Sequence, residues 1–215
     1  MTDLHNCRFL CLNSTSKMPL NNIKKRFNRL GIKCSYYDID DVFDTPPDKQ
    51  NEFNGYAHLR MIYDFYYNSQ NAYGVFCEND IYIHKDIQTL LLKILLDFNI
   101  LRLDVLVLGY DTPFIVDESM TECGFSFKKE TNSKSKYTYH NYPDDLKEAK
   151  MYILSRKYAE YILERYYRGY IDNTFIDNTG EPFAGTEFII TSEGNRALIS
   201  PTIACVNTGT NTEFV

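Results

Sequence analysis

Two acidic side chains, Glu78 and Asp80, follow a short apolar run that has the composition of a buried strand. Carboxylate oxygens are ligands that hard divalent cations prefer, and such ions leave coordination positions open for water and phosphate oxygens. A cation held there can act as a Lewis acid and offset the charge of a departing diphosphate. The pair therefore predicts a site for a divalent cation, with a solvated acidic turn as the alternative.

A second polar group follows the first apolar run of the chain. The segment from Asn13 to Lys17 supplies amide, hydroxyl and ammonium groups just before a predicted helix, where anions are stabilised. The segment lacks the glycine patterns of P-loop proteins and of classical dinucleotide-binding proteins, which disfavours both classes. It favours a loop that contacts a nucleotide, and a plain connector is the alternative.

Two basic side chains, His58 and Arg60, stand early in a predicted helix that precedes the acidic pair. Arginine binds phosphate oxygens through paired hydrogen bonds, so Arg60 is a candidate for a diphosphate contact. A surface arginine and a hydrogen-bonded helix histidine are the alternatives. The sequence has no Gly-x-Ser-x-Gly turn, and no spacing pairs a cysteine nucleophile with a histidine.

Further carboxylates stand late in the chain, at Asp172, Asp177, Glu181 and Glu187. Glu187 follows Thr186 at the start of a predicted short helix, whose dipole would keep the carboxylate ionised. An ionised carboxylate is what a general base or an acceptor of sugar hydroxyls requires. Simple charge complementarity at a helix start is the alternative for Glu187.

The apolar patterning predicts a scaffold that can position these groups. The expected strands are 7–12, 32–39, 72–77, 104–109, 151–154 and 198–206. The expected helices begin at Pro19 and end at Gly31, cover 54–68, begin after a cap at Asp86, and run from a cap at Ser155 to Gly169. Strands that alternate with helices predict an α/β fold, a Rossmann-like single domain with a central, mainly parallel sheet between helices. Residues 112–127 are expected to form a small β insert.

Composition excludes several classes of protein. The chain has 215 residues and a formal net charge of −6, which disfavours a general nucleic-acid binder. It shows no secretory signal pattern and no run of about 18 apolar residues, so we expect no membrane span and a cytoplasmic location. The six cysteines form no close pair and lie mostly in apolar runs, which predicts reduced core thiols.

Tyrosine is unusually frequent, with 18 residues in the chain. Its ring is apolar and its tip is polar, which suits a partly solvated cleft. Biased codon usage is the alternative. Some of the tyrosines, Tyr63, Tyr66 and Tyr166, stand at the spacing of a helix core.

Five segments of the chain occur in an order found in one family of enzymes. They are 55–60 (GYAHLR), 75–81 (VFCENDI), 104–109, 151–159 (MYILSRKYA) and 199–206. Together they resemble the family 25 type of lipopolysaccharide- and collagen-modifying glycosyltransferases, which have the GT-A fold. The chain is also similar to the compact GT-A glycosyltransferase domains of large algal viruses (chloroviruses), which decorate capsid glycans. The resemblance covers 55–206.

The resemblance implies roles for individual residues. The acid-acid-Asp triplet of the family matches Glu78-Asn79-Asp80, with asparagine in place of the middle acid. Its outer members serve Mn²⁺ or Mg²⁺ and the ribose of the donor. The late Val-Asp segment of the family matches Thr186-Glu187, which makes Glu187 the candidate base. Asp172 is the second candidate for that role.

We therefore expect a metal-dependent glycosyltransferase that moves a hexose or deoxyhexose from a UDP-sugar to a hydroxyl of a glycan or glycoprotein, with inversion. For a viral enzyme the acceptor would be a capsid protein and the location the host cytoplasm. Asn13 and Asp38 would contact the nucleoside, Arg60 the diphosphate, and Asp111 the sugar hydroxyls. Two alternatives are a metal-dependent nucleotidyl- or phosphotransferase and a non-catalytic carbohydrate-binding module.

We expect one domain over 1–215. Residues 1–110 would form the half that binds the nucleotide sugar, and 111–215 the half that binds the acceptor. The polar end of the chain, 207–215, is compatible with a longer protein.

Overall fold

The computed structural model describes residues 4–13, 20–38, 50–110, 137–141, 149–167, 190, 193–206 and 214. Seven strands of this part of the chain form one sheet in the order β2-β1-β3-β7-β5-β8-β6. They are β1 (Cys7–Asn13), β2 (Cys34–Asp38), β3 (Tyr73–Glu78), β5 (Val105–Tyr110), β6 (Thr138–Asn141), β7 (Ala149–Ser155) and β8 (Arg196–Ser200). A second, small sheet pairs β4 (Tyr82–Ile83) with β9 (Ala204–Cys205).

Five of the seven strands of the main sheet point in one direction. β1 is parallel to β2 and β3, and β5 is parallel to β8. β7 lies between β3 and β5 and is antiparallel to both, and β6 is antiparallel to β8. The predicted α/β class with a mainly parallel central sheet is confirmed, with one reversed strand, β7, between parallel strands and a second, β6, at the edge of the sheet.

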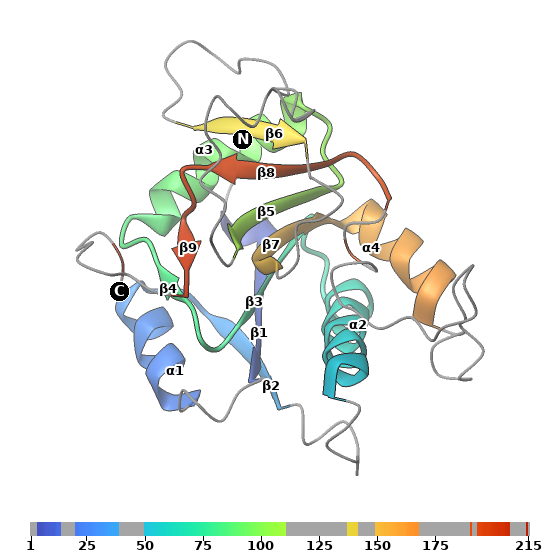
Figure 1. Cartoon of the computed structure of the whole chain (residues 1–215), viewed down its shortest axis with the longest axis horizontal. Helices are drawn as coiled ribbons and strands as arrows, with labels where there is room; N and C mark the ends of the chain where they lie inside the picture. Colours follow the sequence, from blue (N-terminus) through green and yellow to red (C-terminus); the bar gives the residue numbers. More distant parts are fainter. Residues whose placement is uncertain are drawn as a thin grey trace.

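Helices cover both faces of the sheet. The described helices are α1 (Leu20–Arg29), α2 (Gln50–Asn68), α3 (Ile87–Ile100), α4 (Arg156–Ile162), a 3-10 turn (Leu4–Asn6) and a π-helical turn (Leu163–Tyr167) that extends α4. α1 and α3 lie on one side of the sheet, and α2 and α4 lie on the other (Figure 1).

Alternate side chains of each strand enter the two cores. In β1, Phe9 and Cys11 pack in the core that includes α1 and α3, while Leu10 and Leu12 pack in the core that includes α2 and α4. A strand buried on both faces has no polar face, which explains the nearly continuous apolar run in the sequence.

The ends of several elements differ from the sequence-based expectations. α2 begins at Gln50, four residues before the predicted start. The single strand expected over 198–206 is wrong, because β8 ends at Ser200 and β9 pairs with β4 in the other sheet. Pro201 stands at this break, and a proline has no N–H to donate to a strand ladder. The insert expected at 112–127 and the helix expected at Thr186 lie outside the described residues.

Local signals at the helix ends gave mixed results. Ser155 caps α4 as predicted, since its hydroxyl accepts a hydrogen bond from Tyr158 N at 3.1 Å. Gly31 follows α1 with φ +66°, a conformation that glycine adopts without a Cβ clash. Asp86 stands at the N-cap of α3, but its side chain makes no capping hydrogen bond. α4 is shorter than predicted, because the backbone changes to π-helical hydrogen bonding at Leu163.

The described cysteines agree with the prediction of reduced thiols. Cys7, Cys11, Cys34, Cys77 and Cys205 are all free. Among the residues that the structure describes, no helix combines the length and the apolar character that a membrane crossing requires.

Candidate functional site

The chain reverses its winding direction between β1 and β3. From β1 it passes through α1 to β2 on one side, and then through α2 to β3 on the other side of β1. α1 and α2 consequently stand on opposite faces of these strands (Figure 1). In open α/β sheets the ligand crevice lies outside the carboxyl ends of the strands at such a switch point. The carboxyl ends of β1 and β3 are therefore where a ligand site is expected.

Amide and carboxylate side chains meet at these carboxyl ends. Asn13 ends β1, Asp38 ends β2, and Asn79 follows the last residue of β3. The amide nitrogen of Asn13 donates to Asp38 Oδ1, and Asn79 Nδ2 donates to Asn13 Oδ1 at 2.7 Å. Asn79 is fully buried. The Asn13 amide donates through its nitrogen in the first bond and accepts through its oxygen in the second. The two bonds together therefore determine the orientation of this side chain.

The predicted acidic pair lies at the same edge, and a lysine joins it. Lys150 is the second residue of β7, and its neighbour Met151 pairs with Cys77 of β3. Because β7 is antiparallel to β3, this register puts Lys150 opposite Glu78. The Lys150 ammonium is 3.1 Å from Glu78 Oε2 and 3.8 Å from Asp80 Oδ2. The three side chains are 14%, 13% and 19% exposed, so a positive charge is held between two largely buried carboxylates.

We call Asn13, Asp38, Glu78, Asn79, Asp80 and Lys150 the edge cluster. Asn13, Asp38, Glu78 and Asp80 are site residues that the sequence predicted, and the structure brings these four together. The sequence indicated no role for Lys150, because long-range antiparallel pairing determines which residue of β3 lies next to Lys150. It indicated no role for Asn79 either, beyond its place in the middle of the acidic triplet.

The donor chemistry of the cluster fits a divalent cation. Glu78 and Asp80 supply carboxylate oxygens, and they already attract one positive charge, that of Lys150. The described residues contain no group of three or more His, Cys, Asp or Glu arranged to hold a metal ion, so further ligands would be water and phosphate. Two like unit charges 4 Å apart repel by about 4 kcal/mol at an effective dielectric constant near 20. A cation and the Lys150 ammonium therefore cannot share this position.

His58 lies behind the cluster in the core between α2 and the sheet. Its Nδ1 is 2.6 Å from the hydroxyl of Tyr152, and the two rings stack with centroids 5.7 Å apart. Burial, with the nearby charge of Lys150, lowers the pKa of His58 to about 3. The imidazole is therefore neutral at physiological pH. Its hydrogen bond to Tyr152 confirms the alternative of a hydrogen-bonded helix histidine.

The remaining predicted site residues are not part of the cluster as described. Arg60 is an exposed residue of α2, and it forms no ion pair with the described residues of the cluster. Asp111, Asp172 and Glu187 lie outside the described residues, so their predicted roles stay predictions.

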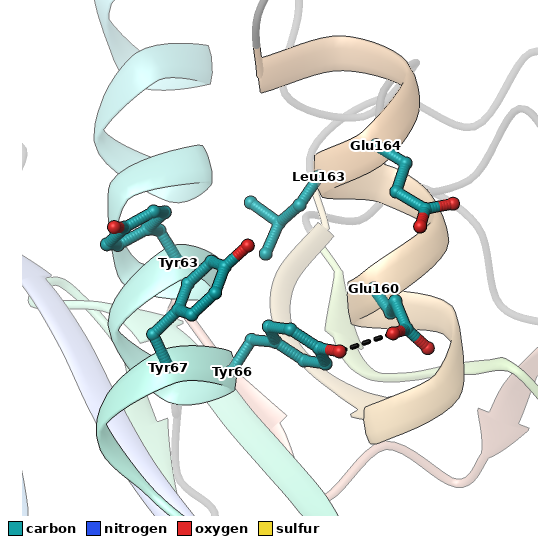
Figure 2. Close-up of a pocket in the computed structure, with 6 residues that line it drawn as sticks. All are labelled: Tyr63, Tyr66, Tyr67, Glu160, Leu163 and Glu164. Carbon is teal, nitrogen blue, oxygen red and sulfur yellow. Dashed lines mark hydrogen bonds between the residues drawn. The ribbon is translucent and has the colours of Figure 1, made fainter.

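A separate pocket of about 130 Å³ lies between α2 and α4, and we call it the tyrosine pocket. It is lined by Tyr63, Tyr66, Tyr67, Glu160, Leu163 and Glu164. Figure 2 shows the three tyrosines on α2, with the hydroxyl of Tyr66 directed to the carboxylate of Glu160, to which it donates a hydrogen bond. Tyr63 and Tyr67 are 36% and 58% exposed, so the prediction that Tyr63 is a core residue is wrong. Tyr166 is buried as predicted.

The tyrosine pocket contains no residue of the edge cluster. Asp64, in the same stretch of α2 as the pocket, accepts hydrogen bonds from Arg8 near the start of β1. Asn13 ends the same strand, and five residues of strand span roughly 16 Å. This stretch of α2 therefore contacts the start of β1, whereas Asn13 of the edge cluster stands at the end of that strand.

No protein-family model matches the sequence, and no curated protein matches it. Among solved structures, the chain is similar to A197 from STIV, with a TM-score of 0.49 and 14% identity over 92% of this chain and 82% of that chain. It is also similar to TarS 1-349 from S. aureus, with a TM-score of 0.46 and 11% identity over 95% of this chain and 52% of that chain. These likenesses concern the path of the chain and assign no activity to it.

Proposed function

We propose that the chain is a glycosyltransferase that binds a nucleotide-sugar donor, a UDP-sugar, at the edge cluster. One observation carries the proposal: polar side chains from the ends of β1, β2 and β3 converge at the switch point of the sheet. That position binds nucleotides in open α/β sheets. The order of the segments that resemble family 25 glycosyltransferases favours a sugar nucleotide over other nucleotides.

The amide end of the cluster is assigned to the nucleoside. Asp38 Oδ1 accepts the hydrogen bond from Asn13, which leaves its other carboxylate oxygen for a ribose hydroxyl. Asn79 holds the Asn13 amide in one orientation, so the acceptor and donor groups are in place before the nucleotide arrives. Such preorganisation lowers the entropic cost of binding.

The acidic end is assigned to the diphosphate. Glu78 and Asp80 would hold Mn²⁺ or Mg²⁺, which would supply positive charge to the departing nucleoside diphosphate. Both carboxylates come from the end of one strand and its following turn, so their separation is set by the backbone of β3. Arg60 is proposed to approach the phosphates from α2.

The acceptor side of the reaction is assigned to the second half of the chain. Glu187, with Asp172 as the second candidate, removes the proton of the acceptor hydroxyl for direct displacement at the anomeric carbon, with inversion. Asp111 binds hydroxyls of the transferred hexose or deoxyhexose. The acceptor is a glycan or glycoprotein.

Thermal stability of the protein with and without UDP and Mn²⁺ tests the proposal. We expect UDP with Mn²⁺ to raise the unfolding midpoint of the wild type. Asp86→Ala is the control and should show the same increase, because the exposed Asp86 side chain makes no capping bond. Asp80→Ala should lose this increase. If no nucleotide shifts the wild-type midpoint, the glycosyltransferase proposal is wrong.

A second measurement separates sugar transfer from the alternative reactions. Slow hydrolysis of one UDP-sugar, from a panel of several, would identify the donor. Glu187→Gln should lose transfer to the acceptor and keep UDP binding. Release of a sugar 1-phosphate instead of UDP would show transfer of the uridylyl group and point to a nucleotidyltransferase, and binding of glycan alone would point to a carbohydrate-binding module.

A further inference from the structure

We infer that Lys150 is an exchangeable cation: its ammonium occupies the acidic pair when the site is empty, and it moves to the donor diphosphate when a divalent cation binds. The inference rests on the proposed function for its second half. Its first half, competition between Lys150 and a divalent cation, depends only on the geometry of Glu78, Asp80 and Lys150.

Burial and charge explain why the empty site needs Lys150. Glu78 and Asp80 are 13% and 19% exposed, so water screens their mutual repulsion only in part. The ammonium of Lys150, 3.1 Å from one carboxylate and 3.8 Å from the other, reduces the net charge of the three groups from −2 to −1. The lysine therefore stabilises the folded protein in the absence of ligand.

The same contact sets a condition for metal binding. A divalent cation bound by Glu78 and Asp80 would lie within a few ångströms of the Lys150 ammonium, where like charges repel strongly. The carboxylates can coordinate the ion only after the ammonium has left them. Lys150 thus competes with the ion, and a divalent cation on its own should bind weakly.

The structure also limits where the displaced ammonium can go. The Lys150 backbone is fixed in β7, which is hydrogen bonded to β3 on one side and to β5 on the other. The side chain is a flexible four-carbon stem, so only the ammonium moves and it stays at the same edge of the sheet. A diphosphate bound beside Glu78 and Asp80 offers oxygens within the reach of that stem.

Donor and cation should therefore bind cooperatively. The diphosphate offers the ammonium a new partner, which removes the competition for the carboxylates, and by linkage the cation raises the affinity for the diphosphate by the same factor. Lys150 would be a positioning residue for the donor and a guard against metal binding without it.

Titration of Mn²⁺ into the nucleotide-free protein, followed by electron paramagnetic resonance or calorimetry, tests the competition. We expect Lys150→Met to bind Mn²⁺ at least about tenfold more tightly than the wild type, because the competing charge is gone. Lys150→Arg keeps the charge and should behave like the wild type. Lys157→Met changes an exposed lysine of α4 and should leave Mn²⁺ affinity unchanged.

Repeating the titration with UDP present tests the exchange. In the wild type UDP should strengthen Mn²⁺ binding at least about tenfold, and in Lys150→Met that gain should shrink to a few-fold. Circular dichroism shows whether Lys150→Met is folded, and Lys150→Gln replaces it if it is not.

The outcomes separate the two proposals. Equal or weaker Mn²⁺ binding by folded Lys150→Met, or no Mn²⁺ binding by either protein, overturns the inference. A gain from UDP that is as large in Lys150→Met as in the wild type overturns its second half. If UDP binds none of the proteins with or without Mn²⁺, the proposed function fails, while the nucleotide-free titration still decides the competition.

Discussion

The edge cluster and the tyrosine pocket both combine acidic groups with hydrogen-bonding side chains, but their construction differs. Groups of the edge cluster come from the ends of four strands, are largely buried, and bond to one another. Groups of the tyrosine pocket come from two neighbouring helices, and two of its tyrosines are exposed. From this difference we expect the donor to bind at the edge cluster and not at the tyrosine pocket.

Several tyrosine hydroxyls in the described residues have partners inside the protein. Tyr139 donates to Asp97, Tyr37 to Asp64, and Tyr158 to the carbonyl of Glu193. Buried tyrosines that find such partners contribute packing and hydrogen bonding to the core. Part of the tyrosine surplus is therefore used for structure.

The largest difference in unfolding free energy is expected between a buried tyrosine of β7, two residues from Lys150, and an exposed tyrosine of the tyrosine pocket. Tyr152 is fully buried, stacks on Phe76 at 5.2 Å and contacts His58, so Tyr152→Ala should lower the free energy of unfolding by about 3–5 kcal/mol. Tyr67→Ala, in the tyrosine pocket, should change it by less than about 0.5 kcal/mol. Urea unfolding of both variants measures the contrast, and equal losses would contradict it.

Two asparagines provide a matched test of hydrogen bonds. Asn79 donates to Asn13 at 2.7 Å in the buried cluster, and Asn68 donates to Asp64 at 2.6 Å on the exposed end of α2. Asn79→Ala should cost about 1–3 kcal/mol in unfolding free energy and weaken UDP binding about tenfold, because the Asn13 amide loses its fixed orientation. Asn68→Ala should change neither quantity measurably. Calorimetric titration of UDP with both variants measures the effect, and a loss of UDP affinity in Asn68→Ala would argue against the edge cluster as the site.

The pH dependence of stability should include a contribution from His58, the residue of α2 that contacts Tyr152. The pKa of His58 is lowered to about 3 in the folded protein, so between that value and the unfolded pKa near 6.5 only the unfolded chain binds the proton. Stability should therefore rise with pH through this window, by about 2 kcal/mol from pH 5 to 6.5. Urea unfolding of His58→Asn at both pH values should lack this contribution. An unchanged pH dependence would show that His58 is protonated in the folded state.

The smallest effect is expected in the tyrosine pocket. Tyr66→Phe removes only the hydrogen bond to Glu160, which lies at the surface. Exposed bonds of this kind contribute little, so neither the unfolding midpoint nor the affinity for UDP should change measurably. A loss of UDP affinity in Tyr66→Phe, measured by calorimetry, would connect the tyrosine pocket to the donor site.

The sequence predicted most of the fold, because strands buried on both faces appear as continuous apolar runs. It also assigned Asn13, Glu78 and Asp80 to one ligand, the nucleotide sugar, and the structure places all three at the carboxyl ends of β1 and β3. Local patterns were enough for these features.

Long-range pairing accounts for what the sequence did not predict. The place of Lys150 depends on the insertion of the antiparallel β7 between β3 and β5, which no local pattern indicates. The break between β8 and β9 has a local signal in Pro201, but the pairing of β9 with β4 does not. Exposure of Tyr63 depends on how closely α4 packs on α2, which helical spacing alone does not give.

Hydrogen exchange with and without UDP and Mn²⁺ tests most directly whether the nucleotide binds at the edge cluster. We predict slower exchange in peptides that cover 9–13 and 76–82, because the ends of β1 and β3 would contact the ligand, and no change in peptides that cover 63–68. Protection of 63–68 without protection of the two strand ends would place the nucleotide at the tyrosine pocket and contradict the account.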